Sequence, residues 1–416
     1  MALPEGTDED ALVNTHSRPY LLRNHKAGGP VQLGGHRGLI QFPEAGDNTM
    51  ASFHRAAKRK IMLIEMDILA LKALHQNTPP DFVANHDRKA TRVLADLVGR
   101  WSEYTASQVE GQPIVVPQID KNGSFTDKFY VTKEVITLVW AASKELFDAY
   151  PGLSIIYDAK DGDAGPFGAG LSHHPEFFVD SVVTVYPYYI KSGQELIQMV
   201  EAYGPAPGWR SNIKWWMVPQ IEGIMRIAFA DFDFSAMTPK KKFEMVFEAT
   251  KEWTISPIAI GLNVTGVTLP VAGIGDRYDI ETGTAIDARG VPVVETALLE
   301  KYFEDRVTIE LFHFMRKEYP ELPLNNIVRA YDVAVGPKRF KWAPIDGNPS
   351  PWGKLYDFHE ALATPGRLYG KYHFDLYIVD QFFRCLEDLF RYDNKLPRTL
   401  TSDNPTADLN IEVLED

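Results

Sequence analysis

The residues Ile61–Leu69, with sequence IMLIEMDIL, give the clearest indication of the fold. It is apolar except for Glu65 and Asp67, a composition typical of a parallel strand that is buried on both faces. Residues i and i+2 of a strand point to the same face, so the two carboxylates lie side by side, roughly 6 to 7 Å apart along the chain. A buried parallel strand requires a crossover connection, and two buried carboxylates require a counter-ion.

A crossover unit precedes this strand. Residues 31–35 form a short apolar run that stops at glycines, and His36 and Arg37 follow it directly. Asp47 or Asn48 can then cap a helix, because apolar residues recur at helical spacing at Met50, Phe53, Ala56 and Ala57. Strand, helix and strand therefore follow one another between residues 31 and 69.

Two acids on one buried face repel each other, and a hard divalent cation with oxygen ligands relieves the repulsion. A further apolar run, Leu153–Lys160, ends in a same-face pair of its own, Asp158 and Lys160. We therefore predict a Mg²⁺ or Ca²⁺ site with ligands Glu65, Asp67 and Asp158. The alternative is a solvated strand end for the first pair and a solvated turn for the second.

These residues carry a family resemblance. In chain order, they resemble the N-terminal signature of the glycerophosphodiester phosphodiesterase family, and the acid-x-Lys pair resembles the strand that follows it there and in the related phospholipase D toxins. The residues 400–405, LTSDNP, look like the last barrel strand of that family. The matching motifs are His36-Arg37-Gly38, Pro43-Glu44, Asn48-Thr49, Ile64-Glu65-Met66-Asp67, His86-Asp87 and Asp158-Ala159-Lys160.

The chain departs from the family pattern at three places. The family's Glu-Asn-Thr is split by residues 45–47, so either Glu44 or Asp47 can occupy the acidic position. A longer loop, residues 72–81, replaces the Thr-x-Asp-Gly turn before His86, and no Trp-Thr-Val-Asn stretch is found late in the chain. These departures affect the prediction of the substrate more than the prediction of the reaction type.

The alternation of strands and helices predicts an α/β fold, a TIM-type (β/α)₈ barrel with insertions. We expect an N-terminal arm over residues 1–30 and a single catalytic barrel over residues 31–410, with insertions near 263–300 and 338–370. The pattern also predicts a strand over Pro113–Asp120 and helices over Val93–Ser107, Lys133–Tyr150 and Phe374–Tyr392.

Two histidines beside a metal site suit proton transfer to and from a phosphodiester. We expect His36 and His86 to be the catalytic acid and base, and Arg37 and Lys160 to bind the phosphate oxygens. The leading function is cleavage of a glycerophosphodiester or a lysophospholipid-like ester. A lyase or biosynthetic enzyme acting on another phosphate or diphosphate ester, and a non-catalytic barrel that binds a phosphorylated ligand, are the alternatives.

Aromatic residues predict the character of the substrate. Tyr188 lies in the segment YPYY, residues 186–189, which follows a predicted strand over residues 182–185. Its position at the catalytic end of a barrel strand favours a substrate with an apolar portion. We therefore expect a small-molecule phosphoester that has an apolar tail, as in lipid metabolism.

Composition excludes several classes of partner. The chain of 416 residues has a formal net charge of −13 at pH 7, which argues against binding to nucleic acid over a broad surface. No run of eighteen apolar residues is present, and the first residues are acidic, so we expect neither a membrane span nor a secretory signal. A cytoplasmic location is the resulting expectation.

Overall fold

A computed structural model describes most of the N-terminal half of the chain and several later segments. The described residues are 6–18, 30–40, 46–75, 78–86, 88–90, 97–119, 125–160, 163–171, 173–185, 213–218, 259–262, 323–328, 375–379 and 382–394, with 237, 241, 278–279, 284–285 and 317.

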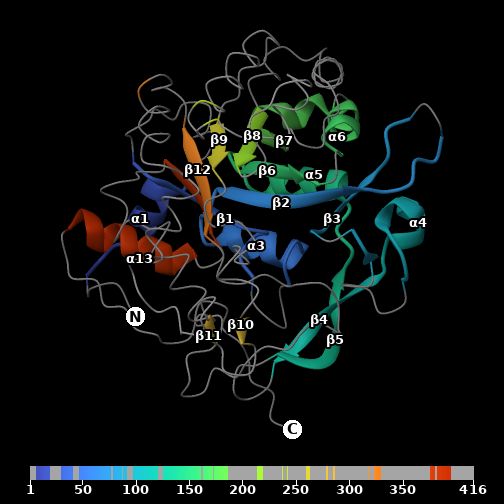
Figure 1. Cartoon of the computed structure of the whole chain (residues 1–416), viewed down its shortest axis with the longest axis horizontal. Coiled ribbons are helices and arrows are strands. Elements are labelled where there is room, and N and C mark those ends of the chain that lie inside the picture. The colour runs from blue at the N-terminus through green and yellow to red at the C-terminus, as the bar shows by residue number, and fades with distance from the viewer. Residues whose placement is uncertain are drawn as a thin grey trace.

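Eight parallel strands of the described part close into a ring (Figure 1). Each strand pairs in parallel with the next along the chain, and the last, β13, pairs with the first, β1. This closed order is the topology of a (β/α)₈ barrel, so the predicted fold is confirmed. The strands are β1 (Gln32–Gly35), β2 (Leu63–Ala70), β6 (Ser154–Ala159), β7 (Ser181–Val185), β8 (Ile213–Val218), β9 (Ala259–Leu262), β12 (Leu324–Val328) and β13 (Leu376–Val379).

Most of the described helices cover the outside of the ring. The helix α3 (Met50–Lys58) links β1 to β2, and it begins at Thr49, whose side chain accepts a hydrogen bond from the backbone of Ser52. Its buried face is apolar, with Phe53 and Ala56 fully buried against the barrel. Farther along are α5 (Val139–Ala149), α6 (Ala164–Leu171) and α13 (Phe382–Asp393). None of the described helices is long and apolar enough to cross a membrane.

The interior of the ring is tightly packed near β1. A Cβ atom added to Gly34 would lie 2.8 Å from Cδ1 of Ile378 and 3.3 Å from Cγ of Leu63. A side chain at this position would therefore require Ile378 and Leu63 to shift. The glycines that end the first apolar run are needed for this close approach.

The helix α1 (Glu9–His16) lies at the amino-terminal ends of β1 and β2, beside α13 (Figure 1). The ring of His16 is hydrogen-bonded to the Val31 carbonyl at 2.8 Å, and the Ser17 hydroxyl accepts a bond from the backbone of Met62 at 3.1 Å. The lead-in thus contains a helix that is tied to the bottom of the barrel. The predicted boundary at residue 30 and the two predicted insertions stay predictions, because those insertions lie almost wholly outside the described residues.

Of the two helices predicted between β2 and β6, the one over Val93–Ser107 was wrong, and the one over Lys133–Tyr150 was confirmed as α5 except that it begins later than predicted. The described part of Val93–Ser107 contains bends and a single 3₁₀ turn, η2 (Trp101–Glu103), followed by the short helix α4 (Ala106–Val109). Lys133–Val135 belong to the strand β5 (Phe125–Val135), which pairs with β4 (Pro113–Ile119) in an antiparallel ribbon beside the barrel (Figure 1). β-Branched and aromatic residues in β5 favour the strand, and pairing with β4 satisfies its backbone.

The carboxyl-terminal predictions also need correction. Residues 376–379, predicted as the start of a helix, form β13, which closes the barrel against β1, and α13 begins only at Phe382. A short apolar run cannot be assigned to strand or helix by periodicity alone, and here pairing on both sides decides it. Among the described residues β13 therefore completes the barrel. The residues 400–405, predicted to be the last barrel strand, lie outside the described residues.

Candidate metal centre and active site

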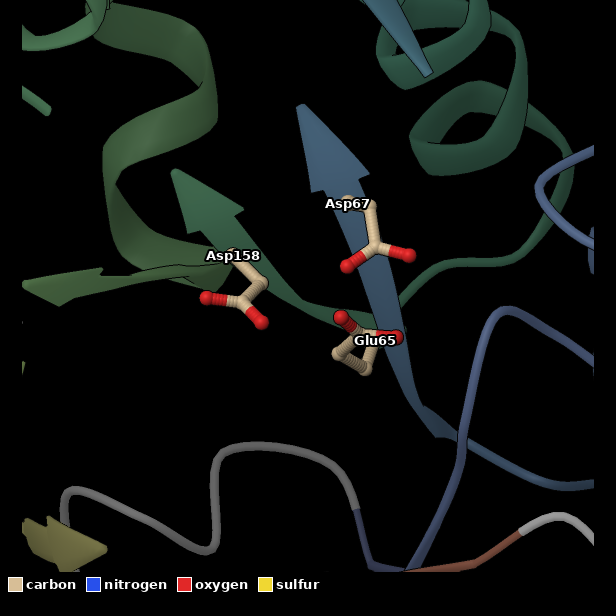
Figure 2. A group of neighbouring side chains, drawn as sticks. All are labelled: Glu65, Asp67 and Asp158. Atoms are coloured by element: carbon tan, nitrogen blue, oxygen red, sulfur yellow. The ribbon is translucent and has the colours of Figure 1, made fainter. Parts of the chain in front are cut away.

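Three buried carboxylates converge inside the barrel (Figure 2). Glu65 and Asp67 come from β2, and Asp158 comes from the neighbouring β6, where it is the register partner of Asp67. One oxygen from each of the three lies within 4.8 Å of the others. Asp67 is fully buried and Glu65 is 2% exposed. The three predicted metal ligands therefore lie together.

The sequence suggested that the strand carrying Glu65 and Asp67 ends near these acids, but β2 extends beyond them. It continues to Ala70 and pairs there with an antiparallel strand, β3 (Phe82–Ala84). This return brings the chain back to the acids, because the backbone of Asn85 donates to the Asp67 carbonyl at 3.0 Å. His86 follows Asn85 directly, so a hairpin, and not a separate strand end, places it beside Asp67.

Two cations flank Asp67. The Lys160 ammonium lies 2.8 Å from Oδ1 of Asp67 and 2.6 Å from Oδ2 of Asp158, so it bridges the two acids. Nε of Arg37 lies 2.9 Å from Oδ2 of Asp67, and its Nη1 lies 3.4 Å from Asp47. Burial alone would raise the pKa of Asp67, but Lys160 and Arg37 outweigh it and hold that pKa well below its usual value. Asp67 is therefore ionised.

Glu65 is in the opposite electrostatic state. Its Oε2 accepts a hydrogen bond from the backbone of Arg37 at 2.9 Å, whereas the described residues offer no hydrogen-bond partner to its buried Oε1. Burial, followed by the charges of Asp67 and Asp158, raises the pKa of Glu65 well above its usual value. A divalent cation would satisfy a buried carboxylate oxygen that has no partner among the described residues and whose carboxyl group lies beside two other acids. The residues therefore fit a hard metal ion.

Asn48 is a site residue whose role sequence reasoning missed. Its side chain donates to Oδ2 of Asp67 at 2.9 Å and accepts from the backbone N–H of Asp67 at 3.0 Å, so it holds the acid at two points. Its φ is 57°, a left-handed conformation that Asn tolerates better than most residues. The sequence presented Asn48 only as a helix cap and as part of a family motif. The two-point contact with Asp67 needs the fold.

The first loop of the barrel is tightly folded around these contacts. Arg37 also has a positive φ, 58°, and Gly38 follows at 88°. A Cβ at Gly38 would lie 2.6 Å from the Ser52 hydroxyl, so the loop needs a glycine there. This conformation turns the backbone N–H of Arg37 to Glu65 and the guanidinium to Asp67 and Asp47. Of the two acids considered at the split motif, Asp47 contacts Arg37, and Glu44 lies outside the described residues.

The predicted catalytic histidines both lie near the acids. His36 directly follows β1, is 2% exposed, and is anchored by its backbone N–H to the Val379 carbonyl at 3.0 Å. Each of His36 and His86, when charged, lowers the pKa of Asp67, which places both imidazoles within electrostatic range of that acid. His86 is partly exposed. Tyr188, the predicted substrate contact, lies outside the described residues.

No protein-family model matches the chain, and a search of curated proteins finds no match. Solved structures that resemble it over most of its length are glycerophosphodiester phosphodiesterases, at low sequence identity. A candidate glycerophosphoryl diester phosphodiesterase from Silicibacter pomeroyi is 11% identical with a TM-score of 0.46, over 91% of this chain and 99% of that chain. A glycerophosphodiester phosphodiesterase from Parabacteroides distasonis is 8% identical with a TM-score of 0.40, over 87% and 97%.

A phosphodiesterase from Oleispira antarctica, solved with the product sn-glycerol-3-phosphate, is 11% identical with a TM-score of 0.41, over 86% of this chain and 96% of that chain. The barrel and the acid cluster of the present chain are defined by its own strand pairings and contacts.

Proposed function

We propose that the chain is a metal-dependent phosphodiesterase that cleaves a glycerophosphodiester or a lysophospholipid-like substrate. The observation that carries the proposal is the buried cluster of Glu65, Asp67 and Asp158, in which one carboxylate oxygen of Glu65 has no hydrogen-bond partner among the described residues. Three buried acids, two of them bridged by a lysine, form a site for a cation and for an anion that the cation attracts.

Glu65, Asp67 and Asp158 would hold Mg²⁺ or Ca²⁺, for which carboxylate oxygens are the preferred ligands. When bound, the ion would neutralise charge on a non-bridging phosphate oxygen as a Lewis acid. Asn48 and the backbone of Arg37 orient two of the three acids before any ligand arrives. The protein's own contribution is therefore a preorganised ligand set.

His36 and His86 would move the protons. One imidazole takes a proton from the attacking hydroxyl, and the other gives a proton to the leaving alkoxide; each such transfer contributes about 10²- to 10⁴-fold. The attacking hydroxyl belongs either to water or to the substrate itself, and in the second case the first product is a cyclic phosphate. The buried His36 and the partly exposed His86 differ in their access to solvent.

Lys160 and Arg37 would stabilise the phosphate. Lys160 is 14% exposed and reaches over two acids, which places its ammonium at the edge of the cluster. Arg37 is 1% exposed and contacts Asp67 and Asp47. It would therefore act in two ways, by its positive charge on the phosphate and by holding Asp67 in place. We further propose an apolar tail on the substrate, packed near Tyr188.

The test compares His36→Ala and His86→Ala with His54→Ala as the matched control. His54 lies on α3 and bonds to Tyr150 and Glu145, away from the acids. With Mg²⁺ or Ca²⁺ present, turnover of glycerophosphocholine, lysophosphatidylcholine and a diphosphate ester is measured. We expect each of the first two variants to lose at least a hundredfold in kcat, and His54→Ala to retain wild-type turnover.

The outcome separates the candidate functions. Near-normal turnover in either active-site variant would remove that histidine from the mechanism. Turnover of the diphosphate ester alone would identify the chain as a lyase or biosynthetic enzyme. Tight binding of a phosphoester without turnover of any substrate would identify a binding barrel.

A further inference from the structure

Thr184 is a buried polar residue that the proposed chemistry has not used. It lies on β7, whose described sequence Ser181–Val185 is SVVTV, so its hydroxyl interrupts a run of valines. The residue is 1% exposed, and its Oγ1 finds no hydrogen-bond partner in the described part of the chain. Such groups are rare in folded proteins, because an unsatisfied hydroxyl destabilises the fold and a valine of nearly the same shape would not.

The strand register places Thr184 beside the acids. It is the parallel-register partner of Asp158, which in turn is the partner of Asp67. Side chains of register partners in a parallel sheet point to the same face, and adjacent strands are about 4.8 Å apart. Asp67, Asp158 and Thr184 therefore form one layer across β2, β6 and β7, and the Thr184 hydroxyl faces the barrel interior next to the acid cluster.

The chemistry of the hydroxyl indicates what it binds. A threonine hydroxyl can donate a hydrogen bond to an anionic oxygen, which a carboxylate in the same layer cannot do. The acids would attract a cation, and the cation an anionic oxygen, so a neutral donor at the edge of the cluster complements the phosphate.

We propose that Thr184 is a substrate-binding residue whose hydroxyl donates a hydrogen bond to a phosphate oxygen. The inference rests on the proposed function and adds a residue to it. It also gives a role to a buried hydroxyl that has no hydrogen-bond partner among the described residues and that lies between two valines. The competing occupant of this position is a buried water molecule, which would satisfy the hydroxyl without any effect on phosphate binding.

The test is calorimetric binding of inorganic phosphate to the full chain loaded with Mg²⁺. Thr184→Val removes the hydroxyl and keeps the shape, and Thr184→Ser restores the donor. The matched control is Thr137→Val, because Thr137 is also buried and its hydroxyl also lacks a partner among the described residues, but it lies outside the ring, after β5. Mg²⁺ affinity and thermal stability are measured on each variant.

We expect Thr184→Val to bind phosphate about ten- to a hundredfold more weakly, as for loss of a hydrogen bond to a charged group. Its Mg²⁺ affinity should stay within twofold of wild type, and its Tm should be equal or higher because an unsatisfied group is removed. Thr184→Ser should recover most of the phosphate affinity, and Thr137→Val should retain it.

Unchanged phosphate affinity in Thr184→Val would overturn the inference while leaving the phosphodiesterase proposal intact. An equal loss in Thr137→Val, or a lowered Tm in Thr184→Val without rescue by serine, would also overturn it, because either result indicates a packing effect. Absence of phosphate binding and of diester turnover in the wild-type protein would instead overturn the proposed function, and the inference with it.

Discussion

Glu65 and Asp67 share one face of β2, yet neutralising them should change stability in opposite directions. Glu65→Gln replaces a carboxyl whose pKa is raised by burial and by Asp67 and Asp158, and glutamine has nearly the shape of the protonated acid. Asp67→Asn replaces a carboxylate that Lys160 and Arg37 keep ionised. In the chelator-treated protein, the first change removes the cost of keeping Glu65 protonated. The second leaves the buried Arg37 and the partly buried Lys160 facing a neutral amide.

The magnitudes follow from these contacts. In the unfolded chain Glu65 ionises near its ordinary value of 4.5. Keeping it protonated in the folded state costs about 1.36 kcal/mol for each pH unit above that value, so Glu65→Gln gains at most about 2.7 kcal/mol at pH 6.5. Asp67 is fully buried and lies within 2.9 Å of both cations, and breaking such a pair from one side costs about 3 to 5 kcal/mol.

The assay is urea unfolding at pH 6.5 with excess chelator, followed by Mg²⁺ calorimetry on the same two variants. Glu65→Gln should unfold at equal or higher urea concentration than wild type, and Asp67→Asn at a clearly lower concentration. Both should lose most of their Mg²⁺ affinity, because each removes an anionic ligand. Equal destabilisation of the two variants would refute the electrostatic assignment, and wild-type Mg²⁺ affinity in Asp67→Asn would refute the metal site.

The remaining predictions concern pH and the support of Asp67. Because the pKa of Glu65 is raised, its contribution to stability is present below pH 4.5 and is lost as the pH rises through the pKa that Glu65 has in the folded protein. A metal ion that binds to Glu65 must also displace its proton. Mg²⁺ affinity should therefore rise with pH above 4.5, and Mg²⁺ binding should release a proton. Calorimetry in buffers of different ionisation enthalpy measures both effects. A pH-independent affinity of the wild type, or an unchanged proton release in Glu65→Gln, would contradict this prediction. Asn48→Ala should lower the free energy of unfolding by about 2 to 4 kcal/mol, since it leaves the buried N–H of Asp67 without a partner and places alanine at a φ of 57°. Asn48→Gly should recover about 1 kcal/mol of that loss in urea unfolding, and equal stability of the two variants would exclude the backbone contribution.

The strands that carry the acids could be predicted from local sequence. Residues 61–69 and 153–160 are apolar runs interrupted by same-face polar pairs, and both became barrel strands in the expected order. Short apolar runs elsewhere were ambiguous. Leu376–Val379 look helical because an amphipathic helix follows directly, and only pairing with β1 and β12 assigns them to the barrel.

Within the site, the local sequence was enough to predict which residue types would lie together. Glu65 and Asp67 share a face because side chains alternate along a strand, and Asp158 joins them because parallel strands align their carboxyl ends. These positions follow from the alternation of side chains along a strand and from the regular alignment of strands in a parallel barrel.

The electrostatic states of Glu65 and Asp67, and the identities of their partners, depend on the tertiary structure. The pKa values of Glu65 and Asp67 move in opposite directions although the two residues are only two positions apart, because the cations contact one acid and not the other. Three further features depend on segments that are distant in sequence. They are the contact of Asn48 with Asp67, the return of the chain through β3 to His86, and the position of Thr184 beside Asp158. Charge interactions act through space, and a residue's position along the chain does not specify its distance to the charges that surround it in the fold.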